Sequence, residues 1–73
     1  MTSKNWSYSE ITRHAEHEIK LFIEHAIQNH REFPELEKNS RAFAYGVFCL
    51  WDSLTEGYRT QEDKERIEAI MKK

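Results

Sequence analysis

Residues 41–56 read RAFAYGVFCLWDSLTE and repeat apolar side chains with the period of an α-helix. Phe43, Val47 and Leu50 share one face of such a helix, and Leu54 extends that face by one turn. Further apolar side chains widen the face on one flank: Ala44, Phe48 and Trp51. A helix that is apolar over most of its circumference needs neighbours on most of its sides. This segment therefore predicts the centre of a helical assembly.

A second amphipathic helix is predicted over residues 8–29, on the N-terminal side of the central segment. Ser7 and Glu10 have the spacing of a capping box, which marks a helix start. The apolar residues that follow recur every three or four positions: Ile11, Ala15, Ile19, Phe22 and Ala26. The spacing indicates one continuous apolar stripe along this helix.

A third, short helix is predicted over residues 61–71. Gly57 suits the left-handed position that ends a helix, and Thr60 with Asp63 repeats the capping-box spacing. The apolar stripe of this helix is narrow and consists of Ile67, Ile70 and Met71. It offers thin cover for a central helix that is apolar on so many sides.

Residues 34–40 leave two interpretations open. Pro34 suits a first helical position, so the segment could begin one long central helix. Ser40 is equally suited to be an N-cap, and on that ground we expect a break and a central helix over residues 41–56.

The composition supports a single small all-α domain over residues 1–73. Gly and Pro total three residues, too few for the many turns of an all-β fold. Nine aromatic residues and a net charge of −2 argue against intrinsic disorder. Short connections make neighbouring helices antiparallel, so we expect a three-helix bundle or an open helical array.

Several function classes are improbable for this composition. The longest uncharged run in the second half, residues 42–51, is about half of a membrane span. Lys and Arg are scattered among acidic residues, which disfavours nucleic-acid binding. A lone cysteine cannot form an internal disulfide, and no apolar core of signal-peptide length occurs in residues 1–20. We therefore expect a cytoplasmic protein that binds neither nucleic acid nor membrane.

Catalysis and cofactor binding find little support. Cys49 has no neighbouring cation to stabilise a thiolate, and no apolar segment encloses a pair of carboxylates. The candidate metal ligands are His14, His17 and Glu18, which are neighbours on one helix. A stable zinc site needs three or four ligands. His25 lies eleven residues after His14, about 16 Å along the helix axis, so the two cannot bind the same ion. We expect no enzyme activity, no cofactor and no metal site within one chain.

The most specific feature is a strip of small side chains on the central helix. Ala42, Gly46, Cys49 and Ser53 recur at helical spacing and would let another helix approach closely. In a monomer, the first and third helices could cover the Phe43 face and the small strip, one each. Chains this small often complete their core by oligomerisation, so we favour a symmetric homodimer with residues 41–56 at or near its axis. The candidate interface comprises Ala42, Tyr45, Gly46, Cys49 and Ser53.

Two functions from different classes follow. The favoured one is a small regulatory or accessory protein that acts by binding itself and another protein. The alternative is a dimeric helical metal or ligand binder that uses the histidine-bearing flank of the first helix. Exposed Trp and Tyr side chains would favour the former, because they are common binding anchors. Converging His and Glu side chains across a dimer axis would favour the latter.

Overall fold

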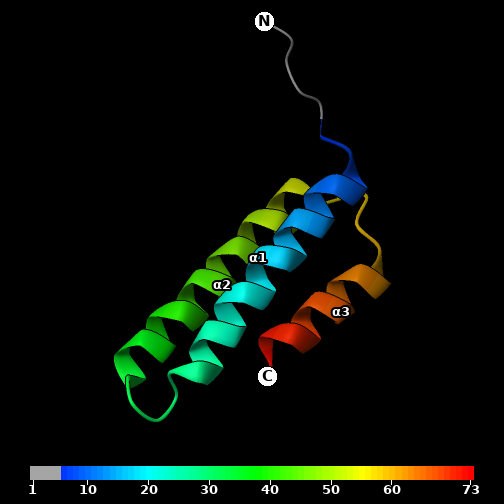
Figure 1. Ribbon diagram of the computed structural model, residues 1–73. Coiled ribbons are helices and arrows are strands. Elements are labelled where there is room, and N and C mark those ends of the chain that lie inside the picture. The colour runs from blue at the N-terminus through cyan, green and yellow to red at the C-terminus, as the bar shows by residue number, and fades with distance from the viewer. Residues whose placement is uncertain (1–5) are drawn as a thin grey trace, which may run out of the picture.

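Three α-helices make up most of residues 6–73, the part of the chain that the computed structural model describes (Figure 1). α1 spans Tyr8–Gln28, α2 spans Pro34–Leu54 and α3 spans Gln61–Met71. No strand occurs within the described residues, so the predicted all-α, three-helix fold is confirmed. The predicted bounds of the third helix coincide with α3, and those of the first exceed α1 by one residue.

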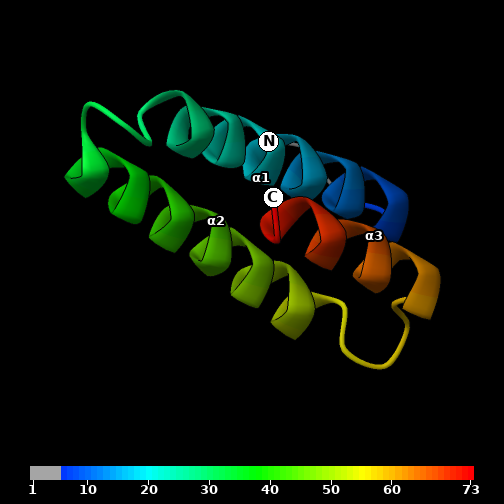
Figure 2. The ribbon, with the colours of Figure 1, turned by 90° about the horizontal axis from the view of Figure 1, so that it is seen from below.

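The two long helices form an antiparallel hairpin, and α3 packs on one face of it (Figure 1, Figure 2). Each long helix has 21 residues, whereas α3 has only 11. α3 follows α2 after a short connection and runs back along the hairpin near α1. A single short helix covers only part of one face, so the arrangement is an open array rather than a closed bundle.

The start of the central helix corrects a sequence prediction. α2 begins at Pro34, not at residue 41, and Ser40 lies buried inside the helix instead of capping it. Pro34 occupies the first turn, where its missing N–H costs nothing, and Glu35 and Glu37 place negative charge at the positive end of the helix dipole. No further proline follows within α2, and the single Gly46 does not interrupt the helix.

Local signals at the starts of α1 and α3 operate as predicted, whereas α2 ends at Leu54 with Thr55 as its C-cap, two residues before the predicted end at residue 56. The Ser7 hydroxyl accepts a hydrogen bond from the Glu10 N–H at 3.2 Å, and the Thr60 hydroxyl accepts one from the Asp63 N–H at the same distance. Gly57 has a φ of 95°, a conformation that side chains with a Cβ rarely adopt, and it turns the chain between α2 and α3.

The core lies where all three helices meet. Ile19 and Ile23 of α1, Trp51 of α2 and Ile67 of α3 are its largest members, and each is at most 3% exposed. Ala44 faces them and brings the two long helices close together. The core is small for 73 residues, because large apolar side chains of α2 such as Phe43, Leu50 and Leu54 are exposed to solvent.

Candidate interaction surface

An apolar groove runs between α1 and α2 on the side of the hairpin opposite α3. Its volume is about 570 Å³, and no residue of α3 lines it. The lining side chains come from the first half of α1, the last half of α2 and the residue that precedes the N-cap of α1: Trp6, Ile11, His14, Ala15, Glu18, Val47, Leu50, Trp51 and Leu54. Glu18 and His14 are the only titratable groups in the lining.

A ridge of large side chains stands beside this groove on α2. Phe43, Leu50 and Leu54 recur at spacings of seven and four residues, and they are 60%, 62% and 51% exposed. The Phe43 ring contacts the Phe22 ring of α1 at a centroid distance of 5.5 Å, which extends the apolar surface across the hairpin. We call this surface the open face and define it by Trp6, Ile11, Phe22, Phe43, Val47, Leu50 and Leu54.

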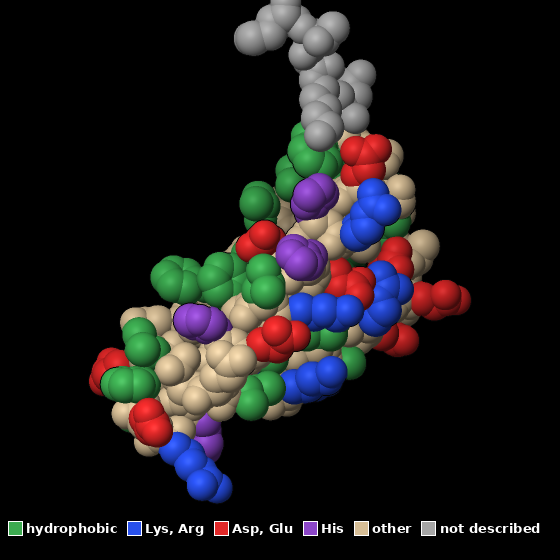
Figure 3. Space-filling model, in the orientation of Figure 1, with side chains coloured by type: hydrophobic (Ala, Val, Ile, Leu, Met, Phe, Trp, Pro, Cys, Tyr) green, Lys and Arg blue, Asp and Glu red, His purple; other side chains and the backbone are tan. Residues whose placement is uncertain are grey.

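The open face corrects the expectation that other helices of a monomer cover this side of the central helix. α3 instead packs on the opposite side of the hairpin, through Ile67 and Ile70. Figure 3 shows the outcome: hydrophobic side chains gather along one edge of the molecule, and many charged side chains gather on the other. The sequence carried one signal for this result, because the apolar stripe of α3 is too narrow to cover α2.

The predicted small-residue interface is also uncovered in a single chain. Ala42, Gly46, Cys49 and Ser53 are all exposed, and Tyr45 beside them is 61% exposed. A Cβ placed on Gly46 would meet no atom within 4 Å. The alternative in which another helix of a monomer covers this strip is therefore not what a single chain shows, and the role of the strip between two chains stays a prediction. The neighbouring Cys49 thiol raises the pKa of the Tyr45 hydroxyl through a hydrogen bond.

The candidate metal ligands do not converge. The His14 ring contacts the Trp6 ring edge-on at 5.0 Å and lines the groove of the open face together with Glu18. His17 instead borders a different pocket, between α1 and α3. Within residues 6–73, no group of three or more His, Cys, Asp or Glu side chains could hold a metal ion. His14 and Glu18 thus share a surface without a third ligand from the same chain.

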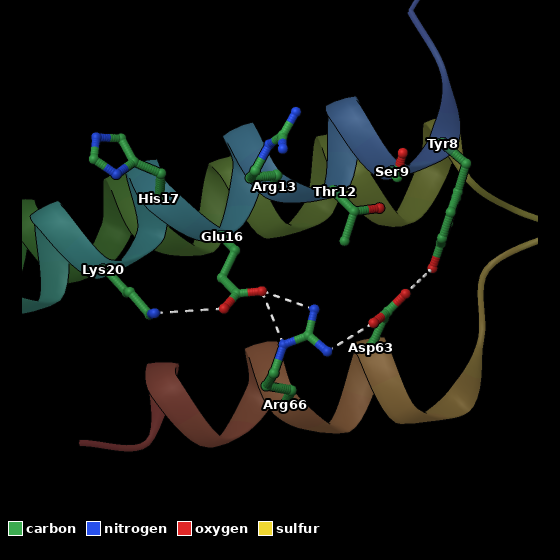
Figure 4. A pocket seen from close by; sticks show the side chains of 9 residues that line it. All are labelled: Tyr8, Ser9, Thr12, Arg13, Glu16, His17, Lys20, Asp63 and Arg66. Carbon is green, nitrogen blue, oxygen red and sulfur yellow. Dashed lines mark hydrogen bonds and ion pairs between the residues drawn. The ribbon is translucent and has the colours of Figure 1, made fainter.

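The pocket between α1 and α3 is polar and has a volume of about 440 Å³ (Figure 4). Arg66 bridges its two carboxylates, since it lies 2.8 Å from Glu16 and 2.7 Å from Asp63. The Tyr8 hydroxyl donates a 2.7 Å hydrogen bond to Asp63, and Lys20 lies 3.5 Å from Glu16. The Arg66–Glu16 and Tyr8–Asp63 contacts join the two helices across 50 and 55 positions of sequence, which local patterns cannot predict. The Lys20–Glu16 and Arg66–Asp63 pairs lie within one helix, and the spacing of Glu16 and Lys20 already indicates the first of them.

The electrostatics of this pocket favour a structural role. The hydrogen bond from Tyr8, with further help from Arg66 and Thr60, lowers the pKa of Asp63. The carboxylates of Glu16 and Asp63 raise the pKa of Arg66. A general acid or base that works near neutral pH needs a pKa close to 7. The pKa of Asp63 and the pKa of Arg66 are both shifted away from 7. The ion pairs of this pocket therefore add to the apolar contact between α3 and α1.

Neither a scan against protein-family models nor searches of curated proteins and of solved structures find a match to this chain. Among the described residues, no helix combines the length and apolarity needed to cross a membrane. The fold and surface define a three-helix protein whose α1–α2 hairpin exposes an apolar face.

Proposed function

We propose that this chain is a protein-interaction module without catalysis of its own, and that the open face binds an apolar, α-helical surface of a protein partner. The observation that carries the proposal is the ridge of Phe43, Leu50 and Leu54, each more than half exposed beside an apolar groove. Isolated exposed apolar residues are common on proteins, but a contiguous apolar surface of this kind usually marks an interaction site.

The shape of the groove favours a helical ligand over a small molecule. Two antiparallel helices leave a straight channel between them, and the side-chain ridge of a third helix fits such a channel. A small-molecule site would need several converging polar groups to orient its ligand. The only titratable side chains that line this groove are His14 and Glu18. An amphipathic helix needs no more than apolar contact and a few polar groups at the rim.

We also propose a reducing, cytoplasmic setting for this activity. Cys49 is a free thiol and lies exposed on the side of α2 away from the core. Exposed single thiols persist more readily where the environment keeps them reduced. The regulatory or accessory role proposed here is compatible with such a compartment.

Site-specific photo-cross-linking in cells tests the proposed function. The full chain would carry a benzophenone amino acid in place of Leu50 or, as the matched control, in place of Tyr45. Both positions lie on α2 and have nearly the same exposure, 62% and 61%, but Tyr45 lies on the other side of the helix from the groove. We expect a discrete protein adduct from position 50, mapped to a helical segment, and none from position 45. The absence of a discrete adduct from position 50, or the same adducts from both positions, would overturn the proposal.

A further inference from the structure

The geometry points to a second copy of this chain as the helical partner of the open face. In the resulting two-fold dimer, the α1–α2 hairpins pack face to face as a four-helix layer, and each α3 lies on the outside. This inference rests on the proposed function, since it identifies the partner of the same surface. Three observations carry it: the size of the face, its shape and its charge.

The size of the hairpin approaches what a stable dimer requires. Each long helix has 21 residues. Two such helices side by side are about 30 Å long and about 20 Å wide, a footprint of roughly 600 Å², which approaches the ~800 Å² that each partner buries in an ordinary stable interface. A second hairpin of the same dimensions covers the face along its whole length. For a chain of 8.8 kDa with a small core, this contact adds a second apolar layer.

The open face also carries both halves of a self-complementary contact. Leu50 and Leu54 form a ridge on α2, while Ile11 and Ala15 of α1 line the groove beside it, with Trp51 of α2 also in its lining. A two-fold axis places the same patch of each copy against the other, so that each ridge meets the partner's groove. Ridges that enter grooves are the ordinary way in which helices pack.

The charge distribution favours contact between two identical faces. Glu18 is the only carboxylate in the lining of the groove, and His14 lies beside it. On the face that Figure 3 shows, many Lys, Arg, Asp and Glu side chains lie on the side of α3, and others lie at the hairpin end. With a net charge of −2 per chain, two copies repel each other only slightly. Little charge must therefore lose its hydration when the open faces meet.

This dimer differs from the one expected from the small-residue strip. Leu50 belongs to the open face, whereas Tyr45 belongs to the strip that contains Gly46 and Cys49. Five residues along an α-helix correspond to about 500°, so the two side chains project to different sides of α2. One substitution at each position therefore distinguishes the two interfaces.

Sedimentation equilibrium of the purified full chain, from about 1 to 500 μM, tests the inference. We expect the unsubstituted chain to approach twice 8.8 kDa. Leu50→Glu should weaken the dimer by about 100-fold or more, because it places a carboxylate of each copy in an apolar contact. Tyr45→Glu should change the dissociation constant by less than about threefold, since its carboxylate stays in water. Circular dichroism of each variant checks that the helices are intact.

A second variant keeps the test decisive if Leu50→Glu fails to fold. Leu50→Ala retains a good helix former at an exposed position, and it should weaken the dimer by about tenfold through lost apolar contact. A mass of 8.8 kDa at every concentration would overturn the inference, as would a dimer that only Tyr45→Glu disrupts. A monomer that still cross-links from position 50 to a different protein would overturn the second-copy inference alone and leave the proposed function standing.

Discussion

The indole N–H of Trp51 donates a 2.9 Å hydrogen bond to the hydroxyl of Thr12, and both side chains are buried. The bond connects α2 to α1 across 39 positions of sequence. Trp51 belongs to the core and also lines the groove of the open face, so its position sets the shape of that groove. A polar contact between the two long helices thus fixes how they are aligned, which apolar packing alone specifies less strictly.

Thr12→Val should lower the free energy of unfolding by about 1–3 kcal/mol, because it leaves a buried indole N–H without an acceptor while conserving side-chain volume. Chemical denaturation with urea measures the change. Thr12→Ser is the matched control, since it retains the acceptor and removes only a methyl group. If Thr12→Val is as stable as the unsubstituted chain and Thr12→Ser is not, packing rather than the hydrogen bond is the dominant contribution of Thr12.

The ion pairs between α1 and α3 predict a pH-dependent stability. The Tyr8 hydroxyl, and to a lesser extent Arg66 and Thr60, lowers the pKa of Asp63 below its ordinary value of 3.8. A carboxyl group whose pKa is lower in the folded state stabilises the fold above the unfolded pKa, and this contribution is lost as the pH falls through the folded pKa. The advantage in unfolding free energy of the unsubstituted chain over Asp63→Asn should therefore be present at pH 6 and shrink below about pH 3.8.

Urea denaturation of both proteins at pH 6 and pH 3 measures this advantage. Tyr8→Phe provides a further comparison, because it removes the hydroxyl that contributes most to the shift while leaving the carboxyl in place. We expect Tyr8→Phe to bring the pKa of Asp63 closer to its ordinary value and to flatten the pH dependence. Equal stability differences between the unsubstituted chain and Asp63→Asn at both pH values would contradict this account.

Apolar burial should outweigh these ion pairs in holding α3. Ile67 is fully buried, so Ile67→Ala should lower the free energy of unfolding by about 2–5 kcal/mol. The side chain of Arg66 is 49% exposed, and Arg66→Gln should cost no more than about 1 kcal/mol. The two residues are adjacent on α3, so their positions within the helix are matched. If Arg66→Gln lowers the free energy of unfolding more than Ile67→Ala does, electrostatic interactions rather than apolar burial dominate the packing of α3.

The sequence predicts those parts of the fold that local chemistry determines. Ser7 and Thr60 cap α1 and α3 as their spacing to Glu10 and Asp63 indicates, since each interaction spans only three residues. The start of α2 was mispredicted because Pro34 and Ser40 carry competing local signals, and burial of Ser40 decided between them. Local signals of equal strength leave such a choice to tertiary packing.

The location of the open face depends on contacts that the sequence does not encode locally. Periodicity identified the apolar face of α2 that contains Phe43 and Leu50 but predicted it to be covered by other helices. α3 instead lies on the other side of the hairpin, where Arg66 meets Glu16. That pair is separated by 50 positions, so periodicity within either helix gives no information about it.

Gly46→Ala tests the small-residue strip through two quantities, the stability of the chain and the dissociation constant of the dimer. Gly46 lies inside α2, where alanine is favoured over glycine by about 0.5–1 kcal/mol, and its new Cβ would enter open space. Gly46 lies one turn before Leu50 and borders the open face. If two copies meet through the open face, Gly46→Ala should raise the free energy of unfolding by about that amount and change the dissociation constant of the dimer only slightly, because a single methyl group at the edge of the contact adds little. Urea denaturation and sedimentation equilibrium measure the two quantities on the same preparations.

Gly57→Ala is the control for the backbone effect alone. A Cβ at Gly57 also meets no atom within 4 Å, but the φ of 95° disfavours any side chain, so this variant should be less stable than the unsubstituted chain. If the free energy of unfolding rises for Gly46→Ala and falls for Gly57→Ala, backbone conformation rather than side-chain contact determines the effect at both positions. If Gly46→Ala instead weakens association, a neighbouring helix must lie close to this glycine in the dimer. If Leu50→Glu leaves that association unchanged, the small-residue strip is the surface between the two copies.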